Sequence, residues 1–427
     1  MEYYHIEGEH TLEGEYRING AKNSVLPIMA ACLCCCGIHE ICECPDIEDV
    51  HQMEKILCHL GCTIWHEDDR VFIDSRCISD VEITQSLMNK MRSSMFLMGS
   101  LLARCGEAEV YRPGGCRIGK RPIDIHIEGL KQIGYEIDEQ DEKICCKGTC
   151  KGGRVVLSYP SVGATENLMM AALSGTSETI IENCAREPEI EDLAGFLQTC
   201  GFVIDGAGTD RITVHGAGNM ECQKGIDVKG DTIYFVMEDR IEAATYMMAV
   251  AATGGRAVFS NIRAEYIRSV LYVMRRMGAF IRNEGDRILI KGPERLAGGG
   301  ITVTSPYPGF PTDCQPQLMS IAAAADGLTT IREEIFESRF THKKDLIKMG
   351  ADIETCGKNA IIKGVPSLVG CEVKALDLRG GAALVIAGLM AEGNTTIKGI
   401  NHIERGYADL EGGLRSLGGK IEKKRAT

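Results

Sequence analysis

Apolar residues recur along this chain in two patterns. One has a helical period: Ile267, Val270, Leu271 and Met274 lie at positions i, i+3, i+4 and i+7, which predicts a helix with one buried face. The other is a short β-branched run bounded by turn residues, as in Arg154-Val155-Val156-Leu157. Each amphipathic stretch is followed by a glycine and a short strand, which fits a left-handed residue at the end of the helix. The chain is therefore predicted to be of the α/β class.

The helix–glycine–strand pattern occurs six times. Its glycines are separated by 73, 67, 77, 72 and 68 residues, at Gly61, Gly134, Gly201, Gly278, Gly350 and Gly418. Each repeat also begins with a helical stretch of small residues, followed by a glycine-marked turn and a short strand. A repeat of about 70 residues cannot bury its apolar face alone, so repeats must pack on one another. We expect two similar domains of three repeats each, divided near residue 237.

Composition narrows the class of protein. The chain has 427 residues, 44% of them hydrophobic and 25% charged, which is typical of a globular protein and long enough for two domains. Its net charge of −13 disfavours non-specific binding to nucleic acid or to an anionic membrane. The first 14 residues are polar and no run of 18 apolar residues occurs, so neither a secretory signal nor a membrane span is expected. Twenty cysteines without such a signal predict reduced thiols and a cytoplasmic protein.

Two cysteine clusters resemble metal sites when read alone. Cys32, Cys34, Cys35 and Cys36, however, fall where other repeats carry small residues such as those of 322–325, so they are interpreted as small buried side chains. The second cluster, at positions 145, 146 and 150, lacks the paired His or Cys spacing of a zinc site. We expect no metal and no cofactor.

One cysteine stands in a different setting. Cys116 follows two glycines, in a loop (residues 112–122) that also carries four cations, Arg112, Arg117, Lys120 and Arg121. Nearby cations lower a thiol pKa, and glycines let backbone approach a ligand, so a reactive thiol beside a phosphate or carboxylate is predicted. The alternative is a surface loop that happens to be basic.

Charged residues also mark the expected starts of the first helix of each repeat. Asp239, Asp313 and Asp377 fit N-terminal caps. Capping does not explain the cations Lys22, Arg92 and Arg379, because a helix N-terminus disfavours positive charge. Together with Arg121 they would surround a strongly anionic ligand bound at the helix starts. The alternative for each cation taken singly is a surface ion pair.

Ordered motifs complete the picture. They are Asn19-Gly20-Ala21-Lys22-Asn23, Met91-Arg92-Ser93-Ser94, Pro113-Gly114-Gly115-Cys116, Gly119-Lys120-Arg121-Pro122-Ile123-Asp124, Ser161-Val162-Gly163-Ala164-Thr165-Glu166-Asn167, Arg186-Glu187-Pro188-Glu189-Ile190, Pro308-Gly309-Phe310-Pro311-Thr312-Asp313, Asp377-Leu378-Arg379 and His402-Ile403-Glu404-Arg405-Gly406-Tyr407. From end to end the chain resembles the UDP-N-acetylglucosamine 1-carboxyvinyltransferases, a family of enolpyruvyl transferases. The resemblance implies an inside-out α/β barrel, with one domain at 22–236, another at 1–21 plus 237–427, and the active site in the cleft between them.

The resemblance also implies a reaction and its residues. The enolpyruvyl group of phosphoenolpyruvate would pass to the 3′-hydroxyl of UDP-N-acetylglucosamine, the first committed step of peptidoglycan synthesis, and phosphate would leave. Cys116 would be the general acid, open to a covalent adduct and to alkylation by fosfomycin, and Asp313 the base. The residues implied for phosphoenolpyruvate are Lys22, Asn23, Cys116, Arg121, Arg379 and Arg405. Those implied for the UDP-sugar are Asn23, Arg92, Arg121, Pro122, Ile123, Asp124, Ile125, Val162, Gly163, Asp313 and Ile335.

Two rival functions remain to be separated by experiment. The shikimate-pathway enolpyruvyl transferase shares the six-repeat fold but uses no cysteine-bearing loop, so Cys116 argues against it. A silent paralogue that only binds the nucleotide sugar would not need Lys22, Cys116, Asp313 and Arg405 together. Departures from the family pattern, at Arg117, Lys120, Cys314 and the Gly380-Gly381 pair, remove no catalytic group. The oligomeric state is not predicted.

Overall fold

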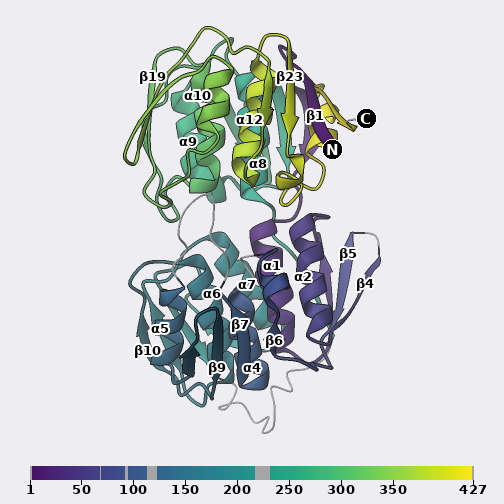
Figure 1. Cartoon of the computed structure of the whole chain (residues 1–427), viewed down its shortest axis with the longest axis vertical. Coiled ribbons are helices and arrows are strands. Elements are labelled where there is room, and N and C mark those ends of the chain that lie inside the picture. Colours follow the sequence, from purple (N-terminus) through teal and green to yellow (C-terminus); the bar gives the residue numbers. More distant parts are fainter. Residues whose placement is uncertain (1, 68, 92–94, 113–122, 217–230, 426–427) are drawn as a thin grey trace. The chain divides into compact units, whose positions relative to one another are not determined.

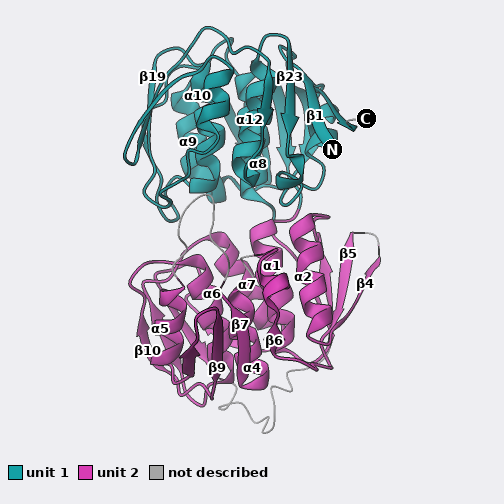
Figure 2. Ribbon diagram, in the orientation of Figure 1, with its two compact units in different colours: residues 1–19, 116–120, 238–427 teal, residues 20–115, 121–237 magenta. Residues whose placement is uncertain are grey.

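The chain forms two compact units (Figure 2). A computed structural model describes residues 2–67, 69–91, 95–112, 123–216 and 231–425. Unit 1 comprises the described residues of 1–19 and 238–427, and unit 2 those of 20–115 and 121–237. Among the described residues the chain therefore passes between the units at 19/20 and again at 237/238. No helix in these ranges combines the length and the apolar character needed to cross a membrane.

Each unit contains three four-stranded sheets with the same pairing. In the order in which the strands lie in each sheet, the first strand runs parallel to the second, and the other neighbouring strands pair antiparallel. In unit 2 the sheet orders are β14-β3-β5-β4, β6-β7-β9-β8 and β10-β11-β13-β12. Their bounds are β3 Ile38–Cys42, β4 Thr63–Glu67, β5 Arg70–Asp74, β6 Glu82–Ile83, β7 Glu107–Tyr111, β8 Glu136–Glu139, β9 Lys143–Lys147, β10 Gly153–Val156, β11 Thr179–Glu182, β12 Val203–Asp205, β13 Arg211–His215 and β14 Thr232–Phe235.

Unit 1 repeats this arrangement and takes two strands from the N-terminus. The sheet orders are β2-β15-β17-β16, β18-β19-β21-β20 and β22-β23-β1-β24, so the first strand of the chain lies between two of the last. Their bounds are β1 Glu2–Glu7, β2 Glu13–Arg17, β15 Arg256–Ser260, β16 Phe280–Glu284, β17 Arg287–Lys291, β18 Gly300–Val303, β19 Leu328–Arg332, β20 Asp352–Cys356, β21 Asn359–Lys363, β22 Glu372–Lys374, β23 Asn394–Lys398 and β24 Lys420–Arg425.

Three helices are buried on all sides at the centre of each unit. In unit 1 they are α8 (Arg240–Ala252), α10 (Gln315–Ala323) and α12 (Leu378–Met390), which pack on one another (Figure 1). In unit 2 they are α1 (Lys22–Ala31), α4 (Leu97–Cys105) and α6 (Val162–Ala171). These helices carry apolar residues on every face, because no face is exposed to water. With helices inside and sheets outside, each unit is an inside-out α/β barrel, as expected.

The remaining helices pack against other helices and against strands. They are α2 (Glu48–His59), α3 (Gln85–Met88), α5 (Asp124–Gln132), α7 (Pro188–Thr199), α9 (Arg268–Arg276), α11 (Lys343–Lys348) and α13 (Leu410–Ser416). The stripe expected after residue 267 is confirmed, since Val270, Leu271 and Met274 are the buried face of α9. Short 3-10 turns η1 (Cys32–Cys34), η3 (Ala172–Ser174), η5 (Ala264–Ile267), η6 (Thr312–Cys314) and η7 (Ile400–His402) complete the described elements.

The six marker glycines and three of the four residues of the first cysteine cluster behave as predicted. All six glycines have φ between +91° and +111°, a range that side chains with a Cβ rarely adopt, and each is followed by a strand. Cys32, Cys34 and Cys35 are fully buried in and beside η1, which occupies the place of η3 in another repeat. The interpretation as small core side chains is confirmed for these three thiols, but not for Cys36, which is only half-buried.

Candidate active site

Lys22 is the first residue of α1 and pairs with an acid from the next helix. Its Nζ lies 2.7 Å from Oδ2 of Asp49, in the first turn of α2, and the two side chains are only 11% and 2% exposed. No side chain caps the start of α1. Because a cation opposes the dipole at a helix start, Asp49 offsets part of the cost of placing it there. A buried ammonium beside helix N–H groups is suited to hold an anion; the next residue, Asn23, is half-buried on the same turn.

The starts of α5 and α6 lie against each other in the same unit. Ile123 is buried, Asp124 and Ile125 begin α5, and Val162 and Gly163 open α6 behind the cap Ser161, whose hydroxyl accepts from Ala164 N at 3.3 Å. A Cβ on Gly163 would lie 3.3 Å from Cε1 of His126, so glycine permits the close approach. Residues 123–125 and 162–163 thus lie at the starts of two helices that pack on each other, and the close approach is between Gly163 and His126.

A buried hydrogen-bond network fixes this junction. Asn167 donates to Nδ1 of His126 at 3.0 Å and to the Met95 carbonyl at 3.2 Å, and its Oδ1 accepts from the backbone N–H of Gly99. Burial lowers the pKa of His126 to about 4, so the imidazole is neutral at physiological pH. Because Nδ1 accepts a hydrogen bond, the ring proton lies on Nε2.

Four predicted site residues lie outside the described part of the chain: Arg92, Cys116, Arg121 and Pro122. Their roles remain predictions from the sequence.

In unit 1, Asp313 is held by two buried arginines. Arg339 donates from Nη2 to Oδ1 at 2.7 Å, and Arg379 donates from Nε to Oδ2 at 3.2 Å. Both guanidinium groups are only 3% exposed, whereas the carboxylate is 28% exposed. Two cations at these distances favour the ionised carboxylate, which is the form that can accept a proton.

Arg379 has hydrogen-bonding capacity left over. Its Nη1 is buried and has no hydrogen-bond partner among the described residues. A buried donor without an acceptor is costly, more so on a charged group. Together with the carboxylate that the same arginine contacts, this donor indicates a place for an anionic or carbonyl oxygen.

Glu333 connects Asp313 to the segment that carries Ile335. Its Oε1 accepts from the backbone N–H groups of Ile335 and Phe336 at 2.9 and 3.1 Å, and its Oε2 accepts from the Thr312 hydroxyl at 3.0 Å. The half-buried Ile335 is thereby tied to the residue before Asp313. Arg405 is also half-buried in this unit, shortly after η7.

The capping predictions divide in two. Asp239 accepts from the N–H groups of Ile241 and Glu242 at 2.8 and 2.9 Å, and Asp377 accepts from Gly380 N at 2.9 Å, so both caps are confirmed. Capping by Asp313 is wrong. A 3-10 turn intervenes before α10 begins, no side chain caps that helix, and the Asp313 carboxylate binds arginines instead.

Sequence reasoning missed three residues of these arrangements: Asp49, Glu333 and Arg339. None lies at the start of a central helix, which was the signal used for the others. The one signal in the sequence for Arg339 is that a cation lies between two aromatic residues, Phe336 and Phe340.

Cys314, next to Asp313, is completely buried, and burial raises its pKa to about 12, so the thiol is chemically inert.

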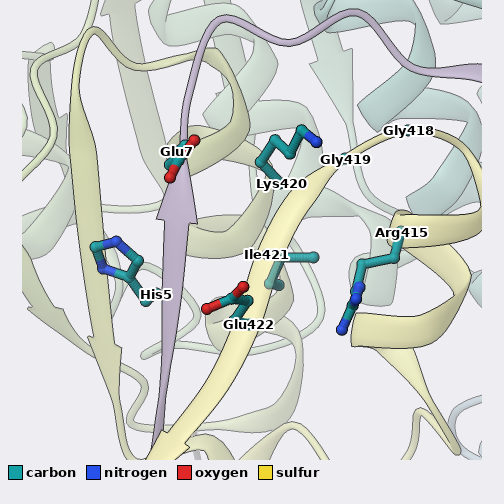
Figure 3. A pocket seen from close by; sticks show the side chains of 8 residues that line it. All are labelled: His5, Glu7, Arg415, Gly418, Gly419, Lys420, Ile421 and Glu422. Carbon is teal, nitrogen blue, oxygen red and sulfur yellow. The ribbon is translucent and has the colours of Figure 1, made fainter.

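Unit 1 also has a surface hollow of about 280 Å³. Figure 3 shows its lining, which comes from β1, α13 and β24 and includes His5, Glu7, Arg415 and Lys420. Its lining includes none of the predicted site residues that the structure describes.

Comparisons with known proteins agree on one family. The family model described as EPSP synthase (3-phosphoshikimate 1-carboxyvinyltransferase) matches residues 6–414. UDP-N-acetylglucosamine 1-carboxyvinyltransferase 2 of Caldanaerobacter subterraneus subsp. tengcongensis is 44% identical, and the alignment covers 99% of both chains. The UDP-N-acetylglucosamine 1-carboxyvinyltransferase of Finegoldia magna is also 44% identical, again over 99% of both chains.

Solved structures share the fold at lower identity. The enolpyruvyl transferase NikO from Streptomyces tendae superposes with a TM-score of 0.86 at 21% identity, over 100% of this chain and 99% of that chain. An EPSP synthase from Acinetobacter baumannii gives a TM-score of 0.73 at 21% identity over the whole of both chains.

Proposed function

The chain belongs to the EPSP synthase family and, within it, to the UDP-N-acetylglucosamine 1-carboxyvinyltransferases, and from this we propose how its residues carry out the transfer. It is an enzyme of peptidoglycan synthesis that moves an enolpyruvyl group from phosphoenolpyruvate to the 3′-hydroxyl of UDP-N-acetylglucosamine. The two small molecules are its substrates. The observation that carries the assignment of residues is the Asp313 carboxylate held between two buried arginines, one of which has a spare donor.

The reaction is an addition followed by an elimination. In the addition, the sugar hydroxyl oxygen bonds to C2 of phosphoenolpyruvate, its proton goes to a base, and C3 takes a proton from an acid. In the elimination, the C2–O bond to phosphate breaks, C3 returns a proton, and the double bond re-forms. Enolpyruvyl ether and inorganic phosphate are the products, and no oxidant or metal is consumed.

Asp313 is the base for the sugar hydroxyl. Arg339 and Arg379 support this role by holding the carboxylate ionised and by fixing both of its oxygens. A fixed acceptor can be aligned with a single hydroxyl, which lowers the entropic cost of the transition state. The partial exposure of Asp313 leaves it accessible to substrate.

Cations hold phosphoenolpyruvate. Lys22 and Arg405, with Arg121 as predicted from the sequence, would bind its phosphate and carboxylate and stabilise charge that develops in the intermediate. Arg379 adds a donor through its buried Nη1. Asn23 would serve both substrates.

The nucleotide sugar would use the junction of α5 and α6 in unit 2. Residues 123–125 and 162–163 lie at the starts of these two helices, and Gly163 leaves room for His126 of α5. With Arg92, Pro122, Asp313 and Ile335 they form the proposed UDP-sugar set. We treat the two compact units as the two catalytic domains, and propose that residues from both act on one reaction.

Cys116 is the general acid at C3. Four neighbouring cations favour its thiolate, which makes the thiol a ready proton donor and a nucleophile toward an epoxide such as fosfomycin. The same property would allow a covalent adduct with phosphoenolpyruvate. Because the chain is rich in thiols and uses a nucleotide sugar, we place the reaction in the cytoplasm.

Intact mass measurement with fosfomycin tests the acid. The wild type should gain one adduct, Cys116→Ser none, and Cys105→Ser, which alters an exposed thiol elsewhere, one. Turnover should fall in Cys116→Ser and persist in Cys105→Ser. Full turnover and labelling in Cys116→Ser would show that another thiol carries these roles.

A further inference from the structure

A chain of polar side chains runs through the apolar centre of unit 1. The hydroxyl of Tyr407 lies 2.8 Å from Thr245 Oγ1, and Gln317 donates to both, at 3.0 Å to the threonine and 3.5 Å to the tyrosine. Thr245 belongs to α8 and Gln317 to α10. All three residues are buried. Polar groups cost stability in such a place unless they are paired, and here the three side chains pair with one another, which fixes their positions.

The ring of Tyr407 leads from this network to the site. The guanidinium carbon of Arg379, on α12, lies 5.5 Å from the centre of the ring. An aromatic face attracts a cation at this distance, and more strongly when water is excluded. Arg379 is 3% exposed and contacts Asp313 through Nε, so the ring lies against the cation that contacts the base.

Tyr407 also ends the turn that carries Arg405. Its backbone N–H donates to the Ile403 carbonyl at 3.2 Å, and Gly406 N donates to the same oxygen at 3.1 Å. The side chain therefore anchors the backbone of this turn to α8 and α10. Tyr407 thus contacts Arg379 through its ring and shares a turn with Arg405, the two cations of unit 1 assigned to phosphoenolpyruvate.

We propose that Tyr407 is a positioning residue for the phosphoenolpyruvate site: its ring orients Arg379, and its hydroxyl, fixed by Thr245 and Gln317, holds the turn that carries Arg405. This inference rests on the proposed function, and it adds a residue that contacts neither substrate. It predicts a selective effect. Binding of phosphoenolpyruvate depends on Tyr407, whereas binding of UDP-N-acetylglucosamine in the part of its pocket that lies in unit 2 does not.

Two substitutions separate the ring from the hydroxyl. Tyr407→Phe keeps the ring and loses the hydrogen bonds, so we expect KM for phosphoenolpyruvate to rise about fivefold. Tyr407→Leu also removes the aromatic face, and the increase should reach about 30-fold, the loss of a desolvated cation–π contact. In both variants KM for the nucleotide sugar should rise much less than KM for phosphoenolpyruvate, because Arg379 reaches the sugar site only through Asp313.

Tyr135 supplies a matched control. It is a buried tyrosine of unit 2 whose hydroxyl donates to the Ala171 carbonyl at 2.9 Å and lies 3.0 Å from Ser174 Oγ. Tyr135→Phe and Tyr407→Phe should both lower Tm, because each removes a buried, hydrogen-bonded hydroxyl. Only the Tyr407 variant should raise KM for phosphoenolpyruvate. A purely structural role would make the two variants alike.

Steady-state kinetics of the full-length enzyme decide the matter, with each substrate varied in turn. Equal KM values for phosphoenolpyruvate in Tyr407→Phe and Tyr135→Phe would overturn the proposal, as would a uniform rise in both KM values. Tyr407→Phe keeps the test valid if Tyr407→Leu does not fold. A wild type that transfers nothing would instead contradict the proposed function on which this inference rests.

Discussion

Replacing Asp49 by asparagine should destabilise unit 2 through Lys22. The carboxylate contacts the ammonium at 2.7 Å, and both side chains are almost entirely out of water. At an effective dielectric constant of about 20 the direct attraction is about 6 kcal/mol. Part of that only offsets the desolvation of the two ions, and removing one member of a buried pair costs about 3 to 5 kcal/mol. We expect the lower end, about 3 kcal/mol, because the asparagine amide can still accept a hydrogen bond.

The single tryptophan makes the measurement specific to unit 2. Trp65 lies on β4, where its ring stacks on Phe72 with centroids 5.1 Å apart, so its fluorescence reports the unfolding of that unit in urea. Glu40→Gln is the matched control in the same unit. Its 2.9 Å pair with Arg70 is more exposed, and its loss should cost less than about 1 kcal/mol.

Inorganic phosphate adds a second readout. In Asp49→Asn the ammonium no longer has its carboxylate competitor, so phosphate should stabilise the variant at least as much as the wild type. Equal urea midpoints for Asp49→Asn and Glu40→Gln would refute the reasoning. Loss of the phosphate effect in Asp49→Asn would show that Lys22 is not an anion site.

Three further outcomes are expected. Asp313→Asn should lower kcat about 1,000-fold while circular dichroism stays unchanged, because the amide cannot accept the hydroxyl proton; a loss of less than tenfold would exclude Asp313 as the base. Gly163→Ala places a Cβ 3.3 Å from Cε1 of His126, so the ring must shift and KM for UDP-N-acetylglucosamine should rise about fivefold in initial-rate assays, with KM for phosphoenolpyruvate unchanged. Burial lowers the pKa of His342 to about 4, below the ordinary value of about 6.5, so the unfolded chain binds a proton that the folded chain does not. The contribution of His342 is therefore complete above about pH 6.5 and falls with pH toward 4, by about 2 kcal/mol at pH 5. His342→Leu should weaken the acid dependence of Tm; an unchanged dependence would show that His342 does not carry it.

The repeat was predictable from sequence because its markers are local. Positions such as Gly201 and Gly350 have a positive φ, which favours glycine. The helix before each of these glycines is recognised from apolar residues at helical spacing, which lie close together in the sequence. The burial of Cys32, Cys34 and Cys35 could be predicted because they align with small residues of the other repeats. Strand partners did not follow: β1 pairs with β23 and β24 across almost the whole chain, and no local pattern specifies a partner that distant.

For the candidate site too, residues marked by a local rule could be predicted, and residues whose role depends on distant partners could not. Lys22 and Arg379 could be proposed from the sequence because a cation at a helix start conflicts with the helix dipole, which is a local rule. Arg339 was missed because its meaning depends on Asp313, 26 residues earlier, and on a fold that brings the two side chains together. The capping assignment of Asp313 failed for the same reason, since long-range ion pairs outweighed the local preference for a helix start. A spacing rule cannot weigh such contacts.

The most direct test of the central claim is mass spectrometry of the products after the full-length enzyme has met phosphoenolpyruvate with each acceptor in turn. UDP-N-acetylglucosamine should acquire one enolpyruvyl group, with inorganic phosphate released in equal amount, and shikimate 3-phosphate should remain unchanged. An enolpyruvyl group on shikimate 3-phosphate, or on neither acceptor, would contradict the account.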